Sequence, residues 1–179
     1  MIVLVGASAS GKTELSKFLF HHFDYKKCVT TTTRPPRINE VDGIDYHFLT
    51  KKRFQELILQ DAFFEVTQYQ NHYYGIQKKD VFTKGVVIVD PSGANTLIDK
   101  LDDRVFVIYV HATKHMRKRR MKKRKDDDEL IQKRLSNDEN VFKKEHLKRI
   151  DLWIENEEND LLVLATEIHQ AYQSFCMKT

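Results

Sequence analysis

Residues 6–13 read Gly6-Ala7-Ser8-Ala9-Ser10-Gly11-Lys12-Thr13, and this stretch decides the fold. It fits the pattern G-x-x-x-x-G-K-[ST], with an apolar strand-like run at residues 2–5 before it and a helix-like segment at 12–23 after it. Small residues let the backbone N–H groups and the helix N-terminus face a phosphate. Lys12 is expected to reach the β- and γ-phosphates of a nucleoside triphosphate, and the Thr13 hydroxyl to ligate Mg²⁺. A tight strand–helix turn without a ligand is the weaker alternative.

Strand-like and helix-like segments alternate over the rest of the chain. Short apolar runs predict buried strands at 86–89, 105–110 and 152–154. Helical spacing predicts helices at 12–23, 94–101, 114–123 and 161–177, and the acidic residues 126–129 predict the start of another helix that ends near His146. The alternation predicts an α/β fold, a parallel sheet flanked by helices.

The segment between residues 30 and 83 follows a different pattern. Thr50 resembles an N-cap before a short helix that contains Phe54, and residues 63–69 are rich in aromatic and β-branched types, as strands are. We therefore expect one domain over residues 1–179, with a strand-rich acceptor-binding insertion. The expected parts are a core (1–29, 84–112 and 135–179), the insertion (30–83) and a small basic lid (113–134).

Composition sets broad limits on the function. The chain has 179 residues and a formal net charge of +4, which suits one domain that binds an anionic ligand. Cys28 and Cys176 are the two cysteines, and this usage is typical of a reducing, cytoplasmic setting. No apolar run approaches about 18 residues, so no membrane span is expected. The first five residues indicate a strand, and a signal peptide is not expected.

Residues 30–48 point to what receives the phosphate. Arg34 and Arg37 are three apart, and arginines can grip a phosphate bidentately. The Pro35-Pro36 pair between them has fixed φ angles, which argues against a floppy, solvated loop. Glu40 and Tyr46 are expected to complete this anion pocket.

The positions around these arginines resemble the nucleotide-binding signature of guanylate kinases over nearly the whole chain. The matching residues are Thr32-Thr33-Arg34-Pro35-Pro36-Arg37, Glu40, Gly43, Asp45-Tyr46, Phe48, Phe64-Glu65, Tyr73-Tyr74-Gly75, Asp90, Gly93, Arg120, Arg124 and Arg134-Leu135. The resemblance implies that the GMP-binding residues are Thr30, Arg34, Arg37, Glu40, Tyr46, Glu65, Tyr74 and Asp90. It also implies that the catalytic cations are Lys12, Arg120, Arg124 and Arg134.

Chemistry supports Glu65 as the residue that reads guanine. A carboxylate accepts two hydrogen bonds, and guanine offers adjacent donors at its ring N1–H and its exocyclic amine. Adenine presents an acceptor at N1, so it would leave a buried charge unpaired at a cost of several kcal/mol. Two positions depart from the family pattern: Ile76 stands where a hydroxyl residue helps to read guanine, and Ile88 where many members have an aspartate. For Asp90, which ends a strand, a plain helix N-cap is the alternative.

Residues 117–125 form a basic run in which Met121 is the one uncharged residue. Most of this run is expected to be a solvated helix face. We favour a lid whose arginines neutralise a transferring phosphoryl group over a nucleic-acid patch, since few aromatic residues lie nearby.

These features together predict a kinase that transfers the γ-phosphoryl group of ATP to GMP or dGMP with Mg²⁺. No general base is required, because a nucleotide phosphate has a second pKa near ~6. The alternatives are a P-loop kinase for another small phosphorylated acceptor, a non-catalytic guanylate-kinase-like module, and, more distantly, an RNA-binding domain. The expected partners are ATP and GMP, without nucleic acid or membrane, and the chain is expected to be a monomer or homodimer.

Overall fold

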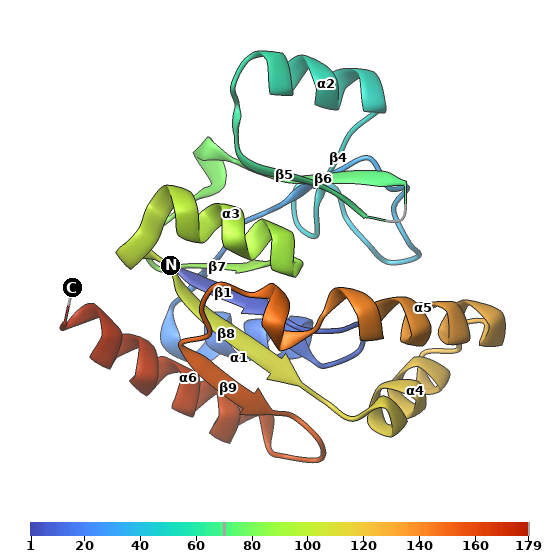
Figure 1. Cartoon of the computed structure of the whole chain (residues 1–179), viewed down its shortest axis with the longest axis vertical. Helices are drawn as coiled ribbons and strands as arrows, with labels where there is room; N and C mark the ends of the chain where they lie inside the picture. Colours follow the sequence, from blue (N-terminus) through green and yellow to red (C-terminus); the bar gives the residue numbers. More distant parts are fainter. Residues whose placement is uncertain (70, 179) are drawn as a thin grey trace.

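A five-stranded parallel sheet forms the centre of the molecule (Figure 1). The computed structural model describes residues 1–69 and 71–178. The strands lie in the order β2 (Lys26–Lys27), β7 (Gly85–Ile88), β1 (Ile2–Val5), β8 (Phe106–His111) and β9 (Leu152–Glu155). All four neighbouring pairs run parallel. The carboxyl ends of β1, β7 and β8 therefore meet at one edge of the sheet, where ligands bind in open α/β folds.

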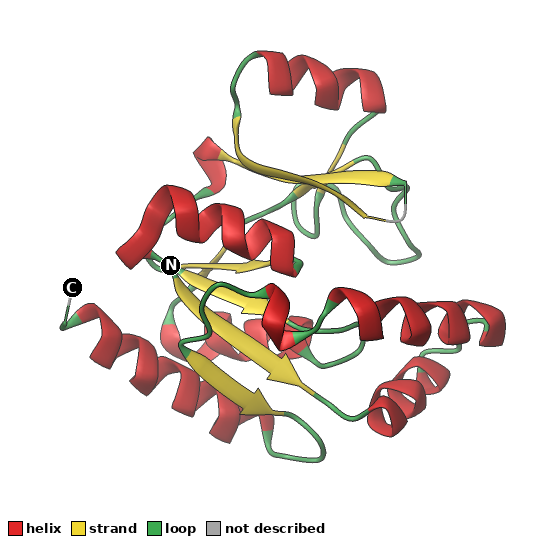
Figure 2. Cartoon of the chain, in the orientation of Figure 1, coloured by secondary structure: helices red, strands yellow, loops and turns green. Residues whose placement is uncertain are grey.

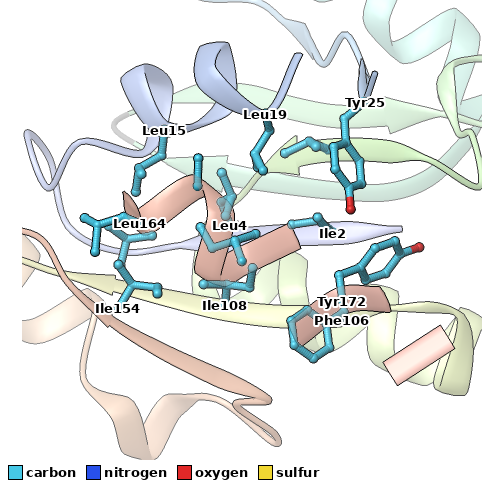
Figure 3. Packing of buried hydrophobic residues seen from close by; sticks show 14 residues of the cluster. Ile2, Leu4, Leu15, Leu19, Tyr25, Phe106, Ile108, Ile154, Leu164 and Tyr172 are labelled. Carbon is cyan, nitrogen blue, oxygen red and sulfur yellow. The ribbon is translucent and has the colours of Figure 1, made fainter. Parts of the chain in front are cut away.

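Helices cover both faces of this sheet (Figure 2). Ile2 and Leu4 face α1 (Lys12–Phe23) and α6 (Leu161–Cys176), and this packing is drawn in Figure 3. Val3 and Val5 face the other way, against α3 (Pro91–Leu101). Successive residues of a strand point to opposite faces, so a strand buried on both sides must be apolar throughout. The short apolar runs in the sequence are these strands.

A second, four-stranded sheet lies beside the first, near the top of Figure 1. Its strands are β4 (His47–Phe48), β3 (Thr31–Thr32), β6 (His72–Gln77) and β5 (Phe63–Tyr69), in that order. Helix α2 (Lys51–Leu59) packs on it through Phe54, which is fully buried and stacks on Phe63 with ring centroids 4.6 Å apart. The Thr50 side chain accepts from the N–H of Arg53, as the sequence predicted for an N-cap.

Two helices project beyond the sheet at the loop end. These are α4 (Lys114–Lys123) and α5 (Asp128–Val141), which share a small apolar cluster of Met121, Ile131 and Leu135. Ala9 of the phosphate loop packs against that cluster. The basic helix is therefore joined to the loop through apolar contacts as well as charges.

The predicted α/β fold is confirmed, with differences at element ends. The helix expected to reach His146 ends at Val141, and a separate 3-10 turn covers Lys144–His146. It ends early because the Phe142 carbonyl accepts from the Tyr109 hydroxyl, and Phe142 then packs against the core. Helix α3 starts at Pro91 because Asp90 caps it. Among the described residues, no helix is long and apolar enough to cross a membrane.

Candidate active site

The phosphate loop is held in place by Asn156, which follows β9. Its side-chain Nδ2 donates to the Ser10 carbonyl at 2.8 Å. Gly11 has a φ of 100°, and a Cβ there would lie 2.1 Å from the same Nδ2. Glycine is therefore required at Gly11 both for its backbone conformation and for this close approach.

Lys12 stands at the start of α1 between two cavities and lines both of them. Its ammonium donates to the carbonyl oxygens of Gly6 at 2.6 Å and Ala7 at 2.9 Å. Burial lowers the pKa of Lys12 to about 8, a shift that the nearby Asp138 charge opposes. A cation at this point can contact an anion in either cavity.

The larger cavity, of about 800 Å³, lies between the loop, α4 and the segment after β9, and we call it the donor cavity. Thr13 is exposed here at the first turn of α1, as a metal-ligating hydroxyl must be. Arg120 lines the cavity and is anchored by hydrogen bonds to the carbonyls of Ala9 and Asn156. Arg124 lines it as well, half-exposed and bonded to Asp126 at 2.9 Å. The donor cavity therefore combines an exposed threonine with two arginines.

The smaller cavity, of about 190 Å³, lies between the loop and the second sheet, and we call it the acceptor cavity. At one end it is lined by Arg34, Arg37, Tyr46 and Tyr74, as the sequence predicted for a phosphate grip. The Arg34 guanidinium donates to both Glu40 oxygens at 2.9 Å and lies 5.3 Å from the centre of the Tyr46 ring. Burial, and then the neighbouring Tyr74, raise the pKa of Tyr46, so its phenol stays a neutral donor.

Glu40 acts on the arginines rather than on the cavity itself. Besides Arg34, it accepts from the backbone N–H of Arg37 at 2.7 Å. The Arg37 side chain is 56% exposed, against 13% for Arg34. Arg34 is thus fixed in place, while Arg37 has room to move toward a ligand.

Glu65 lies at the other end of the acceptor cavity and is 4% exposed. Its Oε1 has no hydrogen-bond partner among the described residues, although it is buried. The Thr67 hydroxyl hydrogen-bonds to the same carboxyl group. Burial, and then the charge of Asp90, raise the pKa of Glu65 to about 8. A Cβ at Gly93 would lie 2.9 Å from Oε1, so Gly93 leaves the carboxyl group its space.

Two threonines, Thr30 and Thr67, line the same cavity as Glu65. Thr30 is 9% exposed and lines the cavity. Ile76 pairs with Glu65 across the sheet but is fully buried in the core cluster below α3. Thr67 was missed from the sequence, although the strand period of two places it on the same face as Glu65. Tyr69 is two residues after Thr67 on the same face of the strand, and it also lines the cavity.

Asp90 is both a helix N-cap and a residue of the acceptor cavity, the two roles considered from the sequence. Its side chain accepts from the N–H of Gly93 at 2.8 Å as the cap of α3, and it lines the acceptor cavity beside Ile88. Arg134 donates to Asp126 at 3.1 Å, and it is not among the described residues that line either cavity. Burial, and then the charge of Arg37, lower the pKa of Arg134. No group of three or more His, Cys, Asp or Glu residues in the described part of the chain has metal-binding geometry.

The parallel sheet, the phosphate loop and the two cavities that meet at Lys12 define a P-loop nucleotide-binding protein. A family model described as guanylate kinase matches residues 1–170. This chain belongs to the guanylate kinase family.

Individual relatives agree with the family model. A guanylate kinase of Onion yellows phytoplasma (strain OY-M) is 37% identical over 170 residues, which cover 88% of this chain and 78% of the relative. Guanylate kinases of Clostridium perfringens are 37% identical over 131 residues, 69% of this chain, and the match spans 61% of their length. The crystal structure of guanylate kinase from Anaplasma phagocytophilum superposes with a TM-score of 0.71 at 20% identity, covering 97% of this chain and 85% of that one. That superposition supports the fold.

Proposed function

We propose that this protein transfers the γ-phosphoryl group of ATP to GMP or dGMP, giving ADP and GDP or dGDP. One observation carries the proposal: a buried glutamate, with one carboxyl oxygen that has no partner among the described residues, lines a cavity whose other end holds two arginines and two tyrosines. The carboxyl end matches the two donors of guanine, and the cationic end matches a phosphate. Membership of the guanylate kinase family supports the same substrates.

In this mechanism the chain positions two phosphates on either side of Lys12. An oxygen of the GMP phosphate attacks the γ-phosphorus, the bond from that phosphorus to the β–γ bridging oxygen breaks, and ADP leaves. Arg34 and Arg37 hold the attacking phosphate in line, and Lys12 neutralises charge on the group in transit. No side chain has to remove a proton, since the acceptor phosphate is largely dianionic above ~6.

Thr13 supplies the protein ligand for Mg²⁺ in this proposal. Thr13 is exposed and lines the donor cavity, and Mg²⁺ is held in such sites by one or two protein oxygens together with substrate phosphates. When bound, the ion neutralises charge on the triphosphate. Arg120 of α4 and Arg124, which follows that helix, add positive charge, and Arg134 adds it from α5.

We propose that the basic run has no nucleic-acid role, because acidic side chains or the loop engage many of its charges. Arg119 pairs with Glu158, Lys122 with Asp128, and Arg124 with Asp126. A cytoplasmic place in purine nucleotide metabolism fits these substrates, and Cys28 and Cys176 are both free thiols.

The decisive experiment measures ADP release with ATP–Mg²⁺ and a panel of GMP, dGMP, IMP, AMP, CMP and UMP. Turnover is expected with GMP or dGMP and little with the others. Turnover with another acceptor would support the alternative kinase. A chain that fails to bind ATP–Mg²⁺ by calorimetry would support the non-catalytic module.

Replacement of Arg37 tests the acceptor grip. Arg37→Met is expected to raise the KM for GMP at least ~10-fold, which corresponds to about 1.4 kcal/mol, while the Kd for ATP stays near its original value. Arg53→Met is the matched control, because Arg53 is an exposed arginine of the same insertion that pairs with Glu56. An unchanged KM for GMP would remove Arg37 from the acceptor site.

A further inference from the structure

A buried ion pair between α4 and α5 lies next to the phosphate loop. Asp138 of α5 is fully buried, and its Oδ2 accepts from the Arg117 guanidinium of α4 at 2.8 Å. The side chains of this pair are 0% and 7% exposed, respectively. Such a pair is costly to desolvate and needs further hydrogen bonds to complete it. In this protein the phosphate loop and the second sheet provide them.

Both backbone polar groups of Ser8 are held by this pair. The Ser8 N–H donates to Asp138 Oδ2 at 2.7 Å, and the Ser8 carbonyl accepts from Arg117 Nε at 2.9 Å. Ser8 is the third residue of the phosphate loop and lines the acceptor cavity. The pair therefore fixes the loop at the point where it faces the acceptor.

The second sheet reaches the same carboxylate through Tyr69. The Tyr69 hydroxyl donates to Asp138 Oδ1 at 3.1 Å and accepts from Asn137 Nδ2 at 3.2 Å. Tyr69 ends β5 and lines the acceptor cavity, and in Figure 1 the end of β5 lies above α5. The Asp138 carboxylate thus accepts from Tyr69 of the acceptor cavity through Oδ1. It accepts from Ser8 of the phosphate loop through Oδ2.

We propose that Asp138 is a positioning residue that couples acceptor binding to the donor loop. When a bound acceptor nucleotide moves Tyr69, the hydrogen bond from the Ser8 N–H to Asp138 changes as well. The backbone N–H groups of the phosphate loop then shift. Arg117, which donates to the same carboxylate, transmits this change to α4. The binding of each nucleotide then alters the affinity for the other, and linkage makes the effect reciprocal.

The test measures this coupling rather than the rate alone, and it rests on the proposed function. The Kd of a non-hydrolysable ATP analogue with Mg²⁺ is measured by calorimetry with and without saturating GMP. The ratio of the two values is the coupling factor. Tyr69→Phe, which removes one hydroxyl, is expected to lower a wild-type factor of about 5 or more by at least ~3-fold. Asp138→Asn is expected to bring the factor close to 1.

Two further variants separate positioning from folding. Asp138→Asn leaves Arg117 buried without its counter-ion and is expected to lower stability, so the double variant Arg117→Met with Asp138→Asn removes both charges. It is expected to fold and still lack coupling. Glu139→Gln is the matched control, since it removes the neighbouring carboxylate of α5 and its exposed pair with Lys114 and should leave the factor unchanged.

The outcomes distinguish this inference from the proposed function. A wild-type chain that phosphorylates none of the panel nucleotides would overturn the proposed function. An active wild type with no coupling, or a Tyr69→Phe or folded double variant with the wild-type factor, would overturn the role of Asp138 while leaving GMP kinase activity intact. Loss of coupling in Tyr69→Phe and the double variant, but not in Glu139→Gln, would support it.

Discussion

At the residue scale, Glu65 has to distinguish guanine from the other bases. Its buried carboxyl group accepts a hydrogen bond from Thr67, and its Oε1 has no hydrogen-bond partner among the described residues. Glu65→Gln replaces an acceptor with an amide donor that opposes the donors of guanine. We expect kcat/KM for GMP to fall about 100-fold, equivalent to about 2.8 kcal/mol of transition-state binding.

The acceptor panel shows whether that loss comes from base recognition. IMP lacks the exocyclic amine, so Glu65→Gln is expected to lower its kcat/KM less than that of GMP. Glu56→Gln on the exposed face of α2 is the control. Equal losses for GMP and IMP would indicate that Glu65 supports the fold of the pocket and does not read the base.

The raised pKa of Glu65 predicts a pH dependence of GMP binding. Burial and Asp90 raise this pKa to about 8, while Thr67 and, further down, Lys100 oppose the shift. Guanine donors bind the ionised form, so binding must release a proton below pH 8. The KM for GMP is expected to fall as pH rises from about 6.5 to 8, by up to about tenfold per unit, and then to level off. Glu65→Gln should abolish this slope, and a pH-independent KM in the wild type would contradict the prediction.

The same raised pKa of Glu65 makes folding less favourable as pH rises, whereas it makes GMP binding more favourable. The folded-state pKa lies above the ordinary value of 4.5, so the native chain binds this proton more tightly than the unfolded chain. The contribution of Glu65 to the free energy of unfolding is therefore fully present below pH 4.5 and is lost as pH rises through about 8.

At the element scale, α5 carries both Arg134 and Asp138, so its N-cap matters for the site. Asp127 accepts from the N–H groups of Glu129 and Leu130 at 3.0 Å. Asp127→Ala is expected to lower the free energy of unfolding by about 1 kcal/mol, measured by urea denaturation. The matched control is Asp128→Ala, which removes an adjacent carboxylate without removing the cap. Equal losses in the two variants would show that the charge near the helix end, and not the cap, is what stabilises α5.

The elements predicted well from sequence are those whose signal is local. The apolar runs of β1 and β8 and the cap at Thr50 are each specified by adjacent residues. The end of α5 was not predictable, because the contact between Tyr109 and Phe142 joins residues 33 apart in the chain. The same is true of the site: the arginine grip is a contiguous motif, whereas the Asp138 pair brings together residues from the loop, α4, α5 and β5.

At the scale of the whole molecule, the second sheet is attached unevenly. At one end, Phe64 and Ile76 pack into the core cluster beneath α3. Elsewhere, polar contacts join it to the core: Tyr69 bonds to Asp138, and Lys27 donates to the carbonyl oxygens of Ile44 and Asp45. Apolar packing resists separation, while an exposed polar contact such as that of Lys27 with Ile44 exchanges its partner for water at small net cost. This asymmetry favours rotation of the sheet about its apolar end.

Such a rotation would close the acceptor cavity toward α4 when both nucleotides are bound, and it would expel water that otherwise hydrolyses ATP. Spin labels at Ile38→Cys and Lys122→Cys test this by pulsed distance measurement, in a background with the exposed Cys176 replaced by serine. Ile38 is 92% exposed in the loop between β3 and β4, and Lys122 is exposed on α4.

The distance between these labels is expected to shorten with the ATP analogue, Mg²⁺ and GMP together, and to shorten less with either nucleotide alone. Labels at Asp103→Cys and Glu167→Cys, both on the core away from the two cavities, should keep their separation and serve as the control. Equal distances in all four ligand states would mean that the two cavities are already in their reactive arrangement. In that case Asp138 would have no movement to transmit, and the coupling measured by calorimetry should also be absent.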